Sequence, residues 1–274
     1  MVHEQPRLPE ALRQRCAEAA LDVDVRGGVL ELFINRPERR NVLNPPLVHC
    51  LIDVLEWAAE AGGLRCVLLS GRGEAFCAGY DIGDIGANGQ AGAESDLVDR
   101  LATHIEELAV PVVAAVNGAA IGGGCDLAIA CDIRLGSTTA RFGMPPARLG
   151  VLYAVNGMRR LVQRAGDSTA RDMLLTGSPV DADRAVNATL ISAVVEPEDL
   201  LERARQCCDR LVANAPLSVA GSKRTLGLLS VAHTWTDDDR AELQEIQHRV
   251  WSSADASEGP LAFRERRSPQ FQGR

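Results

Sequence analysis

The sequence predicts an α/β fold in which a core of alternating strands and helices is followed by a mainly helical C-terminal part. Two observations predict it. Short apolar runs typical of strands recur between segments of helical spacing in the first half of the chain, and from about residue 156 onward helical spacing dominates. A chain that repeats strand, loop and helix favours an α/β architecture with crossover connections.

The first elements expected are a lead-in, a β-hairpin and a helix. Residues 1–20 are polar and predict an irregular or helical lead-in. The apolar runs 23–26 and 29–35 are separated by Gly27-Gly28, which is typical of a hairpin. Residues 45–61 carry apolar side chains at helical spacing, and the glycine pair that follows ends this helix.

The next segments continue the pattern. The continuous apolar run at 66–69 predicts a strand buried on both faces, and the Gly-rich segment 71–92 predicts a long loop of the kind that usually carries function. Further strands are expected at 112–116, 133–135 and 191–195, and further helices at 97–108, 125–131, 200–214, 217–229 and 239–251.

Composition and charge exclude several classes of function. The chain has 274 residues, is 46% hydrophobic and carries a net charge of −8, which argues against a surface for nucleic acid or anionic membranes. An anionic ligand therefore needs a local cluster of Arg or Lys. The eight cysteines form no CxxC pair, which favours free buried thiols over disulfides or a metal site. Without an apolar signal core or spanning segment, the expected location is cytoplasmic.

Two glycine-rich turns carry the strongest functional signal. The run AFCAGYDI at 75–82 follows the buried strand 66–69, and the run NGAAIGGGCDLA at 117–128 follows the strand 112–116 and leads into a helix. Three glycines at a helix N-terminus cost helix propensity, but they leave N–H groups and the positive end of the helix dipole accessible to an anion. Two such loops on one sheet predict an oxyanion hole.

These runs, together with NRPERRNVLN at 35–44, resemble the crotonase (enoyl-CoA hydratase/isomerase) superfamily in order and spacing. The resemblance covers roughly residues 22–272. It implies a spiral of ββα turns over residues 22–200, which holds an acyl-CoA site, and a helical C-terminal region at 201–274 that forms homotrimers or dimers of trimers; residues 1–21 are the lead-in. The oxyanion donors of the family fall on the backbone N–H groups of Tyr80 and Gly123, where a thioester enolate would be stabilised.

The reaction depends on the side chains around this hole. The two Glu carboxylates of the family's hydratases fall on Asp126 and Pro146, so the second carboxylate is missing. The runs FGMPPARLGVLY at 142–153, TGSPV at 176–180 and FRERRSPQF at 263–271 resemble the methylmalonyl-CoA decarboxylase subgroup, in which a Tyr aligned with Tyr153 lies beside the substrate carboxylate. That subgroup has His at the position of Tyr80. The missing carboxylate gives a narrow preference for decarboxylation of a malonyl-type thioester, with hydration or isomerisation by Asp126 alone, or non-catalytic acyl-CoA binding, as alternatives.

The remaining candidates concern coenzyme A, which is part of the substrate, so no separate cofactor is expected. Substrate or CoA contacts are expected at Arg36, Arg40, Ala78, Asp81, Ile82 and Arg266, the arginines because an acidic protein must meet the CoA phosphates with local positive charge. Each candidate also has a purely structural alternative: close helix packing for the three glycines, helix capping for Asp126, core packing for Tyr153, and solvated surface charge for the arginines.

Overall fold

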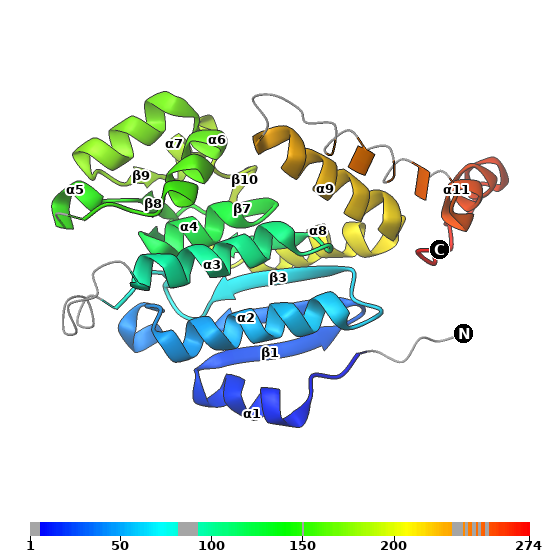
Figure 1. Cartoon of the computed structure of the whole chain (residues 1–274), viewed down its shortest axis with the longest axis horizontal. Helices are drawn as coiled ribbons and strands as arrows, with labels where there is room; N and C mark the ends of the chain where they lie inside the picture. The colour runs from blue at the N-terminus through cyan, green and yellow to red at the C-terminus, as the bar shows by residue number, and fades with distance from the viewer. Residues whose placement is uncertain are drawn as a thin grey trace.

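Two mixed sheets form the centre of the molecule (Figure 1). The computed structural model describes residues 6–81, 93–149, 151–231 and 252–274, with single positions between 232 and 251. The larger sheet has the order β1-β2-β3-β5-β7-β10, with strands Leu21–Arg26, Val29–Ile34, Cys66–Gly71, Val112–Val116, Ile133–Ser137 and Ala193–Val195. The smaller has the order β4-β6-β8-β9, with strands Ala75–Cys77, Ala119–Ile121, Arg141–Gly143 and Val180–Asp181. Neighbouring strands are parallel except in the pairs β1–β2 and β8–β9.

The chain moves from the larger sheet to the smaller one and then into a helix, and it repeats this path. Strand β3 leads into β4 and α3 (Ala93–Glu107), and β5 leads into β6 and α4 (Gly123–Ala130). Strand β7 leads into β8, α5 (Pro146–Leu149) and α6 (Val155–Arg171). These ββα turns confirm the predicted spiral of the α/β core.

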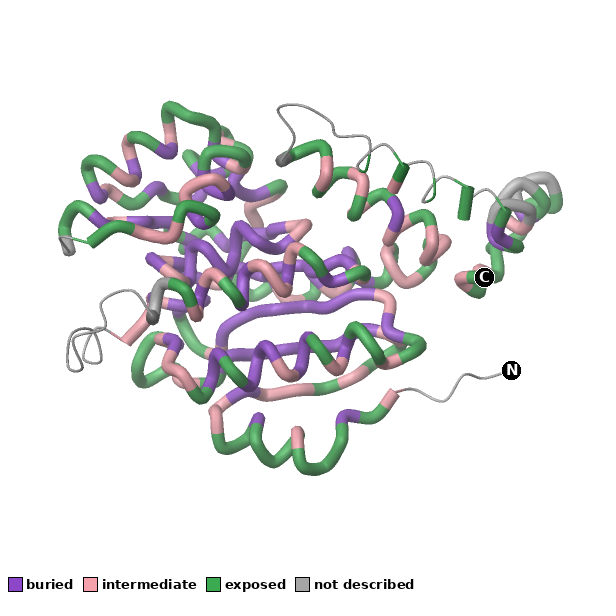
Figure 2. Tube along the Cα trace, viewed as in Figure 1, coloured by how far each residue is buried: buried purple, intermediate pink, exposed green. Residues whose placement is uncertain are grey.

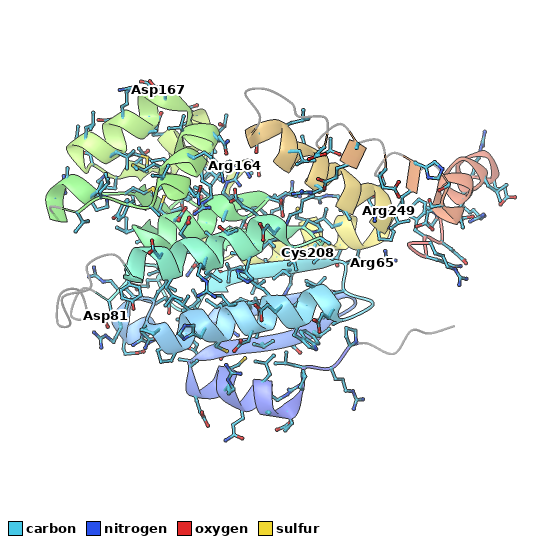
Figure 3. All side chains as sticks on the ribbon, viewed as in Figure 1. Arg65, Asp81, Arg164, Asp167, Cys208 and Arg249 are labelled. Atoms are coloured by element: carbon cyan, nitrogen blue, oxygen red, sulfur yellow. The ribbon has the colours of Figure 1, made fainter. Side chains whose placement is uncertain are left out.

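Helices cover both faces of the larger sheet, whose inner strands β2, β3 and β5 are wholly buried, as Figure 2 shows for the centre of the sheet. On one face, Val67 and Leu69 of β3 pack in the main core with α2 (Pro45–Glu60), α3 and α4. On the other face, Cys66 and Leu68 pack against α8 (Leu200–Ala213), where Cys208 lies (Figure 3). The prediction of a strand buried on both faces is confirmed, because alternate side chains of a strand point to opposite sides.

The hairpin and the cysteines also agree with the sequence. Strands β1 and β2 pair antiparallel around Gly27 and Gly28, whose φ angles are +56° and +85°. All eight cysteines are free and buried, as predicted. The Cys50 thiol donates to Cys16 Sγ at 3.0 Å, which joins α2 to α1 (Glu10–Glu18).

The short strands were not predicted. Strands β4, β6, β8 and β9 have only two or three residues each, too few for an alternating pattern, and β4 and β6 lie within the glycine-rich runs. Their pairing partners are set by the path of the chain between the two sheets. The segment expected as one long loop at 71–92 therefore contains β4, and its residues 82–92 lie outside the described part of the chain.

The C-terminal half is mainly helical, as predicted. It contains the π-helical turn η3 (Asp172–Thr176), α7 (Ala182–Asn187), α9 (Pro216–Val231) and α11 (Ala254–Glu265) in addition to α6 and α8. The predicted helix 239–251 falls mostly outside the described residues. In Figure 1, α11 lies at the edge of the molecule, away from the sheets. Among the described residues, no helix is both long and apolar enough to cross a membrane.

Candidate active site

The two glycine-rich loops meet face to face. A Cβ placed on Gly79, at φ +103°, would lie 2.8 Å from the carbonyl oxygen of Ile121 and 3.7 Å from the backbone nitrogen of Gly123. The neighbouring Tyr80 is held against Leu43, because the Leu43 N–H donates to the Gly79 carbonyl at 2.7 Å and the Asp81 N–H donates to the Leu43 carbonyl at 2.9 Å. The structure thus brings the backbone beside Tyr80 and the start of α4 together.

Each of the three consecutive glycines meets a different requirement. Gly122, the N-cap of α4, has φ +55° and ψ −120°, a conformation that side chains rarely permit. At Gly124, a Cβ would lie 2.0 Å from the carbonyl oxygen of Cys77, so this glycine allows α4 to pack directly on the end of β4. At Gly123, a Cβ would meet Val98 Cγ1 at 3.1 Å. The close-packing explanation therefore accounts for Gly124 but not for the whole triplet.

The N–H of Gly123 suits an anionic oxygen. Gly123 is the first residue of α4 and is partly exposed. The first N–H groups of a helix have no intrahelical acceptor and lie at the positive end of its dipole. The N–H of Asp126, three residues later, donates to the Gly122 carbonyl at 3.0 Å and so has an acceptor within the helix. The start of α4 can therefore present a donor toward the Gly79–Tyr80 loop.

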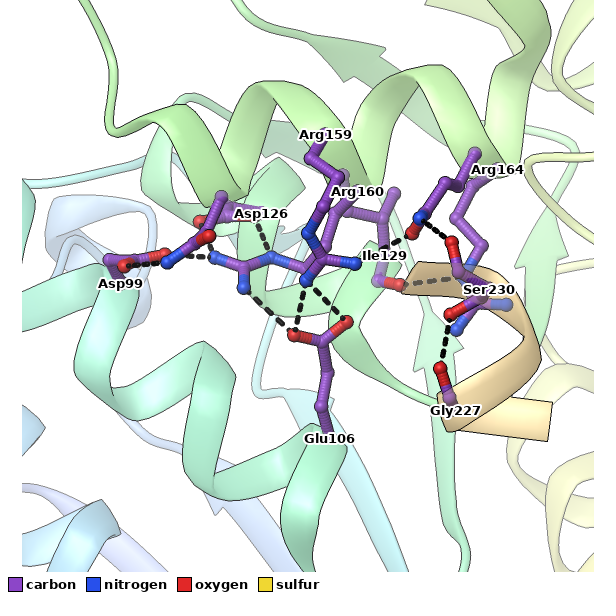
Figure 4. A network of polar contacts seen from close by, with 11 residues as sticks. Asp99, Glu106, Asp126, Ile129, Arg159, Arg160, Arg164, Gly227 and Ser230 are labelled. Atoms are coloured by element: carbon purple, nitrogen blue, oxygen red, sulfur yellow. Dashed lines mark hydrogen bonds and ion pairs between the residues drawn. The ribbon is translucent and has the colours of Figure 1, made fainter. Parts of the chain in front are cut away.

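Asp126 lies in a buried cluster of ion pairs between three helices (Figure 4). Both of its carboxylate oxygens accept from Arg160 of α6, Oδ1 from Nε at 2.8 Å and Oδ2 from Nη2 at 2.9 Å. The Arg160 side chain is fully buried and also donates to Asp99 Oδ1 at 2.5 Å and Glu106 Oε2 at 2.9 Å, both on α3. Glu106 is shared with Arg159, whose Nη2 lies 3.1 Å from Oε2.

This arrangement excludes the helix-capping alternative for Asp126. The carboxylate does not cap α4, since the N-cap is Gly122 and the side chain is turned toward Arg160 instead. Burial raises the pKa of Asp126 above its usual range, while the bonds and charge of Arg160 oppose part of that rise. A carboxyl group of this kind can exchange a proton closer to neutral pH than an exposed aspartate.

Tyr153 lies close to the same glycines. A Cβ placed on Gly122 would lie 3.1 Å from the Tyr153 Oη, so the phenol reaches the start of α4. The ring is partly buried and packs against the main core, which agrees in part with the structural alternative. Burial raises the pKa of Tyr153 to about 12, and the phenol therefore stays protonated at neutral pH and can donate a hydrogen bond.

The residues expected to contact CoA are spread over several environments. Arg36 is partly buried and its Nη1 donates to the Val42 carbonyl at 2.7 Å, which is a structural role. Arg40 is exposed at φ +51°, and its carbonyl accepts from the Ala78 N–H at 3.0 Å. Asp81, labelled in Figure 3, pairs with Arg39 at 2.8 Å. Of these residues, Arg40 and Asp81 adjoin the Tyr80 loop, Arg40 through its bond from Ala78 and Asp81 as the residue after Tyr80.

The two other candidates lie elsewhere. Ile82 is outside the described residues. Arg266 is exposed after the end of α11, at φ +54°, and the structure does not bring it to the glycine loops. Within the described part of the chain, no group of three or more His, Cys, Asp or Glu side chains is arranged to hold a metal ion.

Sequence reasoning missed Arg160, Asp99 and Glu106. One signal was present: Arg160 lies at helical spacing with the small or apolar residues Gly157, Leu161 and Ala165, which are all buried, so an arginine occurs on the buried face of α6. A buried guanidinium needs acceptors for its N–H groups, and carboxylates are the acceptors that also balance its charge. The partners themselves come from a helix more than fifty residues earlier, and spacing alone does not identify them.

Comparison with known proteins defines the family. The sequence model described as enoyl-CoA hydratase/isomerase matches residues 24–274. The chain belongs to the enoyl-CoA hydratase/isomerase family. This confirms the resemblance to the crotonase superfamily and makes the protein an enzyme-family member that is consistent with acyl-CoA thioester substrates.

Several relatives of this family cover almost the whole chain. Carnitinyl-CoA dehydratase of Proteus mirabilis is 35% identical, over 93% of this chain and 99% of the relative. The 2,3-dehydroadipyl-CoA hydratase of Escherichia coli is 32% identical, over 90% and 96%. The crystal structure of an enoyl-CoA hydratase from Bacillus anthracis superposes with a TM-score of 0.87 at 29% identity, over 93% of this chain and 100% of that one.

Proposed function

We propose that this protein adds water to the double bond of a 2-enoyl-CoA thioester, or removes it in the reverse direction, with Asp126 as the single acid/base carboxylate. The observation that carries the proposal is the position of Asp126. It lies in the first turn of α4, whose first residue is Gly123, and both of its oxygens are fixed by Arg160. The names of the relatives, a dehydratase and a hydratase, support this reaction over decarboxylation.

The oxyanion hole is the first part of the proposed mechanism. The N–H groups of Tyr80 and Gly123 would both donate to the thioester oxygen. The negative charge on that oxygen grows as the enolate forms, so these donors stabilise the transition state more than the substrate. Removal of one such donor typically raises the barrier by about 3–4 kcal/mol.

The second part is proton transfer by Asp126. A carboxylate has roughly four lone-pair positions, and Arg160 occupies two, which leaves each oxygen able to accept from water. Asp126 takes a proton from the water whose oxygen bonds to C3, and the electrons of the double bond move onto the thioester oxygen. Asp126 then returns the proton to C2 as the enolate collapses. The atoms balance, and no cofactor beyond the CoA of the substrate is needed.

Decarboxylation of a malonyl-type thioester is the second candidate. Two observations favour it: Pro146 occupies the position of the second carboxylate, and the protonated phenol of Tyr153 reaches the start of α4, where it would hold a departing carboxylate. Cleavage of the C–CO₂ bond needs no base once that bond is held perpendicular to the thioester plane.

The test uses two variants and two substrates. Asp126→Asn should lower the rate of water addition to crotonyl-CoA by about 10² to 10⁴, while Tyr153→Phe should change it little. Retained hydration in Asp126→Asn would rule out this role. If Tyr153→Phe instead slows CO₂ release from methylmalonyl-CoA and the wild type does not hydrate, decarboxylation replaces hydration. Tight binding of both thioesters without turnover would mean a non-catalytic acyl-CoA-binding protein.

A further inference from the structure

The cluster around Arg160 is more elaborate than packing requires. Arg160 has five N–H donors, and four of them bond to three carboxylates from two helices. Burying this much charge is costly, and apolar side chains of similar volume often give equal or greater stability. The presence of such a cluster next to the start of α4 therefore calls for a role besides stability.

The charges of the cluster do not cancel. Asp99, Glu106 and Asp126 supply three carboxylates, whereas Arg159 and Arg160 supply two guanidinium groups. One negative charge remains in excess when all five groups are ionised. The excess is relieved when one carboxylate takes a proton. Asp126 is the most buried of the three, with 7% of its side chain exposed against 18% for Asp99 and 23% for Glu106.

We propose that Arg160, held by Asp99 and Glu106, is a positioning residue that fixes the carboxylate of Asp126, and that Asp126, the most buried carboxylate of the cluster, is the member that gains and loses the proton. Asp99 is itself fixed by a second donor, Asn156 Nδ2 at 3.0 Å, and Glu106 by Arg159. The Arg160 guanidinium is therefore held by two carboxylates that lie two turns apart on α3, and its Nε and Nη2 hold the plane of the Asp126 carboxylate. This inference rests on the proposed function of Asp126.

Most of the other titratable groups around Asp126 cannot exchange a proton near neutral pH. They are Arg160 from α6, Asp99 and Glu106 from α3, Tyr153 from the segment before α6, and Cys125 on α4. Burial raises the pKa of Tyr153 to about 12 and that of Cys125 further, so both stay protonated near neutral pH. Arg160 stays charged: burial is the largest single effect and lowers its pKa, but the hydrogen bonds and charges of Asp126, Glu106 and Asp99 together raise it by more.

Substitutions in the cluster separate position from charge. Arg160→Lys keeps the positive charge but cannot form the fork, so kcat for crotonyl-CoA hydration should fall on the order of 10²-fold with KM nearly unchanged. Fewer hydrogen bonds to the ionised form should also move the acidic limb of the kcat profile to higher pH. Asp99→Asn and Glu106→Gln each remove a negative charge that favours the protonated form, and each should move that limb to lower pH by roughly one unit.

The matched control is Arg205→Lys. Arg205 forms a two-bond fork with buried Glu31 at 2.8 Å, but on the opposite face of the larger sheet. Loss of the paired hydrogen bonds between Arg205 and Glu31 should lower the melting temperature without changing kcat or the pH profile of kcat. If Arg160→Lys does not fold, the shift of the acidic limb can still be measured in Asp99→Asn and Glu106→Gln, because both substitutions are at partly exposed positions.

The outcomes are distinguishable. If Asp126→Asn retains hydration, the proposed function fails and the inference fails with it. If Asp126→Asn is inactive but the three cluster variants behave like Arg205→Lys, with altered melting temperature only, the inference alone is overturned. Opposite shifts of the acidic limb for Arg160→Lys and Asp99→Asn support it.

Discussion

At the scale of single residues, the space around Asp126 is as important as its charge. Gly157, the third residue of α6, is buried, and a Cβ placed on it would lie 3.0 Å from Asp126 Oδ2 and 3.3 Å from Oδ1. The absence of a side chain at residue 157 lets the carboxylate lie against the backbone of α6, in line with Arg160 one turn later.

Gly157→Ala should therefore move the carboxylate while improving the helix. We expect hydration to slow by up to about 10²-fold, because a misplacement of about 1 Å can cost that much and the added Cβ must push the carboxylate aside. The control is Gly227→Ala in α9, where a Cβ meets nothing within 4 Å, and there the substitution should leave kcat unchanged and stabilise by up to about 1 kcal/mol. Steady-state kinetics and thermal unfolding of both variants measure the difference. Equal kcat in the two variants would contradict a tight fit at residue 157.

The residue scale also shows how far sequence reasoning reaches. The sequence predicts a functional role for the glycines of both loops, because a cluster of glycines at a helix start is unfavourable for the helix itself. The family resemblance then adds Asp126 and Tyr153 to the site. Arg160 was not identified, since its meaning depends on three carboxylates from other parts of the chain. The partners of a charged side chain in the core come from tertiary contacts, and the spacing of residues along the chain does not predict those contacts.

At the scale of elements, the site depends on the contact between α4 and β4. The helix starts immediately after β6, and Gly124 lies against the carbonyl of Cys77 at the end of β4. Sequence patterns predicted the long strands and helices, because their apolar spacing is strong. They did not predict β4 or β6, whose residues are few and small and whose pairing is set by the spiral path.

Gly124→Ala tests this contact. A Cβ 2.0 Å from a backbone oxygen cannot be relieved by a side-chain rotation, so α4 and β4 must separate. Overpacking of this kind typically destabilises by about 1–3 kcal/mol or more, and the oxyanion donors should lose their spacing as well. The control Gly62→Ala lies in an exposed turn with nothing within 4 Å of its Cβ. Chemical denaturation of both variants gives the free energy of unfolding, and equal values would refute the close contact.

At the scale of the whole molecule, the C-terminal helices divide into two kinds. Helix α8 buries Leu200, Ala204, Cys207 and Cys208 against the larger sheet, so it belongs to the core packing, although the predicted oligomerisation region begins at 201. The α9 and α11 helices instead leave large apolar side chains exposed: Leu226 is 65% exposed, Leu229 45% and Leu261 39%. Exposed leucines gathered on peripheral helices are typical of an interaction surface.

The crotonase resemblance implies a homotrimer or a dimer of trimers, and the exposed leucines lead us to expect that it associates through the helical C-terminal region. Burial of each leucine side chain would contribute roughly 1.5–3 kcal/mol, so the three exposed leucines of α9 and α11 would favour association through these helices. The double variant Leu226→Glu/Leu229→Glu should shift the mass measured by light scattering toward a smaller species. Val186→Glu on α7, which is 36% exposed and lies outside this region, should leave the mass unchanged. A wild-type protein that remains monomeric at micromolar concentration would contradict the prediction, because the leucines would then face solvent for another reason.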